Sequence, residues 1–178
     1  MRIAAPLITL LAFAATSAAI AQSRHDSSAP IDFDAAHIEL QDNQGRAILT
    51  GAVKVRQAEM TLTAARMTVT YTGKVVAGSP EVSRLDASGG VVVSRPDQTA
   101  RGQYGVYDIN RRVIIMLGGV TLVQGANTVS GSRLTINLDT GKANIDGSGV
   151  VTGGAPGTMH TAPSGRVTGR FSVPKRNQ

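Results

Sequence analysis

The chain has 178 residues, no cysteine or tryptophan, 3% aromatic residues and a formal net charge of +6. The lack of cysteine excludes a disulfide scaffold, a cysteine-ligated metal site and a thiol nucleophile. Too few aromatic side chains are present for stacking on bases, so we expect no nucleic-acid partner. Residues 32–146 hold 11 acidic and 12 basic side chains, so the positive excess lies outside this nearly neutral segment.

Residues 1–21 are typical of a secretory signal peptide. Arg2 is followed by an apolar stretch and then by Ala19, Ile20 and Ala21, which form a small-residue cleavage site before Gln22. The alternative is a membrane anchor, which is disfavoured because the apolar stretch is shorter than the ~20 residues of a spanning helix. We therefore expect a soluble exported product, in which the polar residues 22–30 form a flexible leader.

Residues 31–152 show an all-β rhythm. Runs of Val, Ile, Leu and Thr are broken every few residues by Gly, Asn or Asp, and apolar and polar residues alternate in segments such as 53–56, 67–71 and 134–138. Placing a reversal at each glycine predicts about sixteen short antiparallel strands. Residues 113–117 are apolar on both faces, so the sequence does not decide which face points inward.

An internal repeat underlies this rhythm. Residues 46–71 align with residues 113–138 at an offset of 67, and a middle copy places Gly89 on Gly118. A weaker fourth copy begins at Gly149. Such a repeat predicts one small β unit stacked on itself. Residues 153–178 are rich in Gly and Pro and have only positive charges, which predicts a basic, disordered tail.

The chain offers little catalytic chemistry. His25, His37 and His160 have no metal-binding spacing, and the glycines lie between strands rather than before helices. Asp86, Asp108, Asp139 and Asp146 stand at strand ends, where Asp favours turns. We expect no enzyme, no metal and no cofactor; an enzyme acting on envelope glycans through a carboxylate pair is a minor alternative.

The most informative feature is the apolar face of the alternating strands. Its residues are mostly medium-sized aliphatics, and a laterally stacked repeat with few aromatics predicts a trough for acyl chains rather than only a dry core between sheets. The candidate lipid-binding residues are Val53, Val55, Leu62, Met67, Val69, Tyr71, Val91, Val93, Val120, Leu122, Leu134, Ile136 and Leu138. Lys54, Arg56 and Arg133 are candidates for contact with a phosphorylated head group.

Several segments together resemble the OstA-like domain family. They are the signal peptide, the strands GAVKV (51–55) and GGVTL (118–122), the segment VSGSRLTINLD (129–139) and the turn GKA (141–143). The resemblance covers residues 32–151. It implies an open β-jellyroll that holds the lipid A acyl chains of lipopolysaccharide. It also implies copies that join head to tail between an LptC-like inner-membrane protein and an LptD-like outer-membrane protein.

An open jellyroll leaves an unpaired strand edge at each end. We expect these assembly edges at Ile31 and Phe33 and at Gly149, Val150 and Val151. Two other functions stay open: an LptC-like membrane-anchored transport component, and a structural β-solenoid or adhesin with a dry interior. The sequence does not indicate the lipid A variant, the number of copies or the role of the tail.

Overall fold

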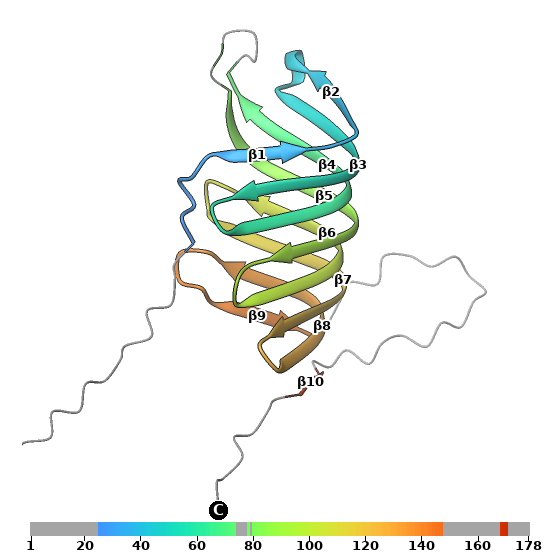
Figure 1. Ribbon diagram of the computed structural model, residues 1–178, viewed down its shortest axis with the longest axis vertical. Helices are drawn as coiled ribbons and strands as arrows, with labels where there is room; N and C mark the ends of the chain where they lie inside the picture. The colour runs from blue at the N-terminus through green and yellow to red at the C-terminus, as the bar shows by residue number, and fades with distance from the viewer. Residues whose placement is uncertain (1–24, 74–77, 79, 148–167, 171–178) are drawn as a thin grey trace, which may run out of the picture.

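A computed structural model describes residues 25–73, 78, 80–147 and 168–170. This part of the chain forms one antiparallel sheet of ten strands in the order β1-β3-β4-β5-β6-β7-β8-β10, with β2 also on β3 and β9 also on β8 (Figure 1). The strands are β1 (Ile31–Asp34), β2 (His37–Gln41), β3 (Arg46–Gln57), β4 (Met60–Thr72), β5 (Glu81–Ser94), β6 (Gln98–Asp108), β7 (Val113–Gln124), β8 (Asn127–Asn137), β9 (Ala143–Asp146) and β10 (Thr168–Arg170). One short 3-10 helix, η1 (Asp42–Gln44), joins β2 to β3.

The β-jellyroll-like fold agrees with the sequence prediction, but the strand number does not. The glycines were expected to reverse the chain, whereas Gly51, Gly89 and Gly118 lie inside long strands, at φ values of 83°, 83° and 84°. The pairing register shifts there, between Thr50 and Val53 on β3 and at the corresponding points of β5 and β7. Two residues thus face one on the neighbouring strand, which is a β-bulge that bends the strand without ending it.

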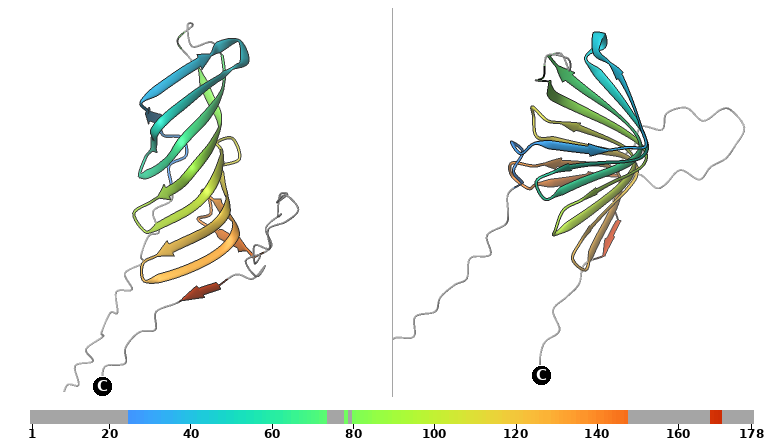
Figure 2. Two further views of the ribbon diagram at one scale, coloured as in Figure 1. Left: turned by 90° about the vertical axis from the view of Figure 1, so that its right-hand side faces the viewer. Right: turned by 45° about the horizontal axis from the view of Figure 1, so that its top comes forward.

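The aligned bulges form a corner that folds the sheet into two leaves. Figure 2 (right) shows the strands converging on one side and spreading apart on the other. We call the half-strands that end at turns 58–59, 95–97 and 125–126 the first leaf, and those that end at segments 109–112 and 138–142 the second leaf. The side where these turns lie is the mouth. The buried apolar side chains form one core cluster between the leaves.

The hairpins β3–β4, β5–β6 and β7–β8 are the repeating units. The offset of 67 carries the bounds of β3, residues 46 and 57, onto those of β7, residues 113 and 124. The first glycine of each bulge packs closely on a neighbouring segment: a Cβ at Gly89 would lie 2.8 Å from the Ala65 Cβ, and one at Gly118 equally close to the Gln103 Cβ. The corner therefore requires glycine at this repeated position.

Short strands complete both edges of the stack. β1 pairs with the first-leaf half of β3 and β2 with its second-leaf half. At the other edge, β9 pairs with the second-leaf half of β8 and β10 with its first-leaf half. Since β10 belongs to the segment expected to be disordered, residues 168–170 depart from that expectation. The fourth repeat copy at Gly149 lies outside the described residues.

Candidate functional site

All thirteen candidate lipid-binding residues lie in the interior between the leaves, and each is buried. Seven come from the first leaf: Val53, Val55, Leu62, Val91, Val93, Val120 and Leu122. Six come from the second: Met67, Val69, Tyr71, Leu134, Ile136 and Leu138. The alternation of neighbouring side chains across a strand explains this placement. The structure contains no lipid, so contact with acyl chains stays a prediction.

The interior also holds large residues that the sequence analysis did not single out. Leu49, Met60, Leu85 and Tyr107 are at most 2% exposed. In residues 113–117, Ile114 and Met116 point inward, because they pair in register with the inward Ile136 and Leu134 of β8. The alternation of apolar and polar residues within β3 and β4 indicates that Leu49 and Met60 point inward. For residues 113–117, the inward face follows only from the strand register.

The interior is almost entirely apolar. Among the described residues, the buried polar side chains are Gln57 and Gln98, and none is charged. The aliphatic surface continues through all six long strands, β3 to β8. This continuity suits an elongated apolar ligand better than a compact polar one.

At the mouth, one buried amide joins the two leaves. The hydroxyl of Tyr107 on the second leaf donates to Gln57 Oε1 on the first leaf, with an O···O distance of 2.7 Å. Burial raises the pKa of Tyr107, although hydrogen bonds that include Gln57 partly offset the rise. The Tyr107 hydroxyl therefore remains a protonated donor at neutral pH.

The segment before β1 meets the same amide. Gln57 Nε2 donates to the carbonyl oxygens of Ser27 and Ala29, at 3.0 Å each, and a ring nitrogen of His25 lies 3.2 Å from Gln57 Oε1. Burial lowers the pKa of His25, against an opposing effect of the Gln57 hydrogen bond. Figures 1 and 2 show this segment on the side where the strands spread apart. The part of the leader from residue 25 to residue 30 thus has a defined position across the mouth.

The candidate head-group cations lie on outer faces. Lys54 and Arg56 pair in register with Asp34 and Asp32 of β1, so opposite charges face each other across the strands. Arg133 is exposed near the corner. None of the three projects into the interior.

Cations at the mouth were missed by the sequence analysis. Arg95 lies in a first-leaf turn, and Arg111 and Arg112 lie in a second-leaf turn. Arg112 forms an ion pair of 3.0 Å with Asp139, whereas the Arg111–Asp108 pair is longer, at 4.0 Å. A search for charged residues in the turns that lie on the same side of the sheet would have identified these arginines.

Three of the four carboxylates expected at strand ends form ion pairs or hydrogen bonds. Asp86 lies inside β5 rather than at a strand end, and it pairs with Arg84 at 2.7 Å. Asp139 pairs with Arg112, and Asp108 accepts the Arg111 backbone N–H at 2.9 Å. Asp146 ends β9 and is exposed. The described residues contain no cluster of three or more His, Asp or Glu side chains suited to a metal ion.

The N-terminal edge carries an exposed apolar group on the terminal strands. Phe33 of β1 is 49% exposed, and Ile38 and Leu40 of β2 are 41% and 57% exposed. Ile31, the other expected edge residue here, packs partly against the core. At the opposite edge, Gly149, Val150 and Val151 lie outside the described residues.

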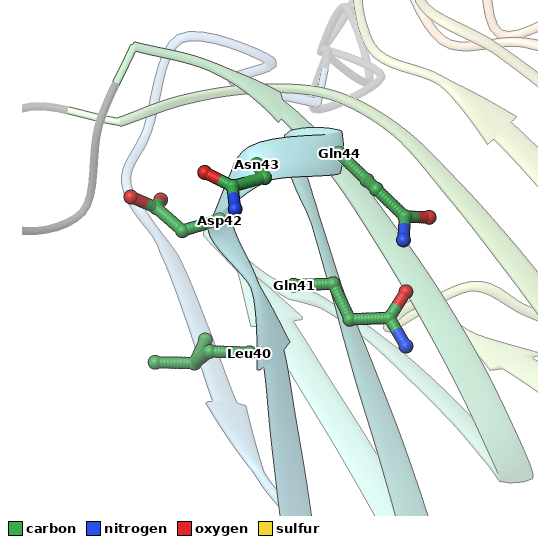
Figure 3. A pocket seen from close by; sticks show the side chains of 5 residues that line it. All are labelled: Leu40, Gln41, Asp42, Asn43 and Gln44. Carbon is green, nitrogen blue, oxygen red and sulfur yellow. The ribbon is translucent and has the colours of Figure 1, made fainter.

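A shallow pocket lies beside this edge. It is lined by residues 40–44, which run from the end of β2 through η1 (Figure 3). Tyr71 donates a 3.2 Å hydrogen bond to Asp42, which ties η1 to β4. The pocket comes from one short segment at the tip of the sheet and is separate from the interior.

This arrangement is that of an open jellyroll-like protein with an aliphatic interior. In the described residues, no helix is long and apolar enough to span a membrane. The family model described as "LptA/(LptD N-terminal domain) LPS transport protein" matches residues 32–142. The chain therefore belongs to this family of lipopolysaccharide transport proteins, which is a family of transport components rather than enzymes.

The chain is also similar to a bacterial protein in sequence and to a solved structure in fold. An uncharacterized protein of Rhizobium meliloti (strain 1021) is 35% identical over 150 residues, which cover 82% of this chain and 81% of that protein. The fold is similar to the crystal structure of LptH, the LptA-homologous periplasmic component of the lipopolysaccharide transport device of Pseudomonas aeruginosa. The TM-score is 0.66 at 22% identity, covering 84% of this chain and 99% of LptH.

Proposed function

We propose that this protein is a periplasmic carrier that shields the lipid A acyl chains of lipopolysaccharide between its two leaves. The observation that supports this most strongly is the aliphatic interior, which runs from β3 to β8 without a buried charge in the described residues. Burying one CH₂ group contributes about 0.8 kcal/mol, so a twelve-carbon chain exposed to water costs on the order of 10 kcal/mol. Such a lipid needs a continuous apolar path to cross an aqueous compartment.

The basic turns at the mouth fit the head group in this proposal. Acyl chains enter between the leaves while the phosphorylated sugars stay outside, next to Arg95, Arg111 and Arg112. Arginine is well suited to phosphate because its planar group donates two parallel hydrogen bonds. Nothing in this process requires catalysis.

We further propose that the protein bridges LptC-like and LptD-like partners. Each end of the stack presents short strands, and the N-terminal edge exposes Phe33, Ile38 and Leu40. Pairing between the two different edges extends head to tail rather than closing a dimer. Light scattering should show reversible, concentration-dependent oligomers, and a monomer at all concentrations would contradict the bridge.

A binding experiment tests the carrier function. Delipidated protein should bind purified lipopolysaccharide, and the lipopolysaccharide should displace a fluorescent fatty acid, whereas the deacylated sugar should not displace it. If the protein binds neither acylated ligand, the structural β-solenoid with a dry interior is the better description. The LptC-like anchored alternative predicts instead that the exported product retains residues 1–21, which mass spectrometry would show.

A further inference from the structure

The interior is closed in this structure, so an acyl chain has to separate the leaves before it can bind. The thirteen candidate residues are at most 8% exposed. The corner fixes the leaves to each other on one side through the continuous strands β3 to β8. Entry from the side therefore takes place at the mouth, where side-chain contacts join the two leaves in the described part of the chain.

Residues 25–30 lie at this point and connect to both leaves through Gln57. Gln57 contacts Ser27 and Ala29 through Nε2, and it accepts the Tyr107 hydrogen bond from the second leaf through Oε1. His25 lies near Glu59 and Arg95, which belong to two first-leaf turns. One side chain thus links the segment, the first leaf and the second leaf.

The segment has a compact shape of its own. The Asp26 carboxylate accepts hydrogen bonds from the Ser28 backbone N–H and hydroxyl, at 3.0 and 2.6 Å, and the Ala29 N–H reaches the Asp26 carbonyl at 3.3 Å. These bonds form a turn that does not depend on the sheet. The turn can therefore leave the mouth as a unit.

The attachment of the segment is polar rather than apolar. None of residues 25–30 belongs to the core cluster or to the hydrophobic residues packed against it. The Ser27 side chain lies within reach of the Tyr107 hydroxyl, which already donates to Gln57. Docking thus depends on polar contacts to Gln57 and Tyr107, and water can replace these contacts when the segment leaves.

We infer that residues 25–30 form a strap that closes the mouth, with Gln57 as its latch, and that an entering acyl chain displaces it. The inference rests on the proposed function for the identity of the ligand. The lipid and the strap then compete for the mouth. The apparent affinity for the lipid is therefore the intrinsic affinity multiplied by the fraction of molecules in which the strap is open. A strap of this kind keeps the aliphatic interior dry between ligands.

The absence of cysteine makes the strap easy to label. Ser28→Cys places a nitroxide on an exposed position of the strap; it removes the hydroxyl bond to Asp26 but keeps the backbone N–H bond to the same carboxylate. Electron paramagnetic resonance reports the mobility of the label. The variant Gln57→Met removes the amide at similar length. Gln98→Met is the matched control, because Gln98 is the other buried glutamine and has no recorded contact with the strap.

The probe ligand is cis-parinaric acid, a fluorescent fatty acid. In the otherwise unchanged chain, the label should be immobile without the probe and mobile at saturation. Gln57→Met should make the label mobile without ligand and raise the apparent affinity for the probe about tenfold, if the strap is closed in nine molecules of ten. Gln98→Met should leave label mobility unchanged. A chain lacking residues 22–29, which retains all ten described strands, should bind like Gln57→Met.

The outcomes of these measurements separate the strap from the proposed function. Probe binding that leaves the label immobile, or equal affinity of the original chain, Gln57→Met and the shortened chain, overturns the strap alone. If neither the original chain nor the shortened chain binds the probe, the carrier function itself is contradicted. A mobile label in the original chain without any ligand also overturns the strap.

Discussion

Single residues on one strand separate the interior from the outer surface. Ile136 is 1% exposed, whereas its neighbour Thr135 points to the opposite face and is half-buried. The two positions lie on the same strand, between the same two neighbouring strands, and have the same backbone geometry. Substituting each one in turn therefore tests the facing of the strand without changing its location.

We predict that Ile136→Asp destabilises the fold and that Thr135→Asp does not. An uncompensated charge in the apolar interior costs about 3–5 kcal/mol, whereas an outward substitution changes stability by about 0.5 kcal/mol or less. Chemical denaturation of both variants measures the difference. Equal loss of stability in the two variants would contradict the inward position of Ile136.

The sequence was informative about inward residues and uninformative about the mouth. Alternation selected thirteen apolar positions, because the period of two is a local property of each strand. The strap was expected to be flexible, since residues 25–30 are polar and lack periodicity. Their position depends on Gln57, which lies 28 residues after Ala29, and on Tyr107, which lies 50 residues further along the chain; folding brings them to the segment.

At the scale of elements, the paired bulges determine the shape of the sheet. A glycine with positive φ is compatible with a reversal and with a bulge, which explains why the number of strands was overestimated from sequence. The second bulge position tolerates a side chain, because Ala52 occupies it in the first repeat at φ 50°. Gly90 is its equivalent in the middle repeat, at φ 69° and with open space around a Cβ.

We predict that Gly89→Ala is much more harmful than Gly90→Ala. Both substitutions carry the cost of a positive φ, about 1–2 kcal/mol. Gly89→Ala adds a clash with the Ala65 Cβ at 2.8 Å, which should cost a further 1–3 kcal/mol or so, as overpacking does. Thermal unfolding of the pair tests this expectation, and a smaller loss for Gly89→Ala would contradict the proposed packing at the corner.

A second element-scale prediction concerns the tail. Deleting the residues after Pro156 removes β10, whose three residues are exposed and pair with β8 at residues 128–130. The body should stay folded, with a loss of no more than about 3 kcal/mol, because each backbone hydrogen bond contributes about 1 kcal/mol net. The uncovered edge of β8 should strengthen self-association. Circular dichroism and light scattering measure the two effects, and unfolding of the body or unchanged association would count against this role of β10.

At the scale of the whole molecule, stacking of similar hairpins produces both the interior and the edges. Each hairpin adds aliphatic residues to both leaves, so the apolar interior lengthens with the stack. Each added unit also moves the unpaired edge outward without closing it. One architecture thus accounts for lipid shielding and for head-to-tail extension in the proposed function.

The most direct test is photo-crosslinking to lipopolysaccharide in cells. Photo-reactive residues at Val55, Leu62, Val69 and Ile136 point into the interior and should capture lipopolysaccharide. Matched positions at Lys54, Thr68 and Thr135 lie next to them on the same strands and point outward, so they should capture none. Equal capture from both sets, or capture from the outward set alone, would contradict the claim that the acyl chains lie between the leaves.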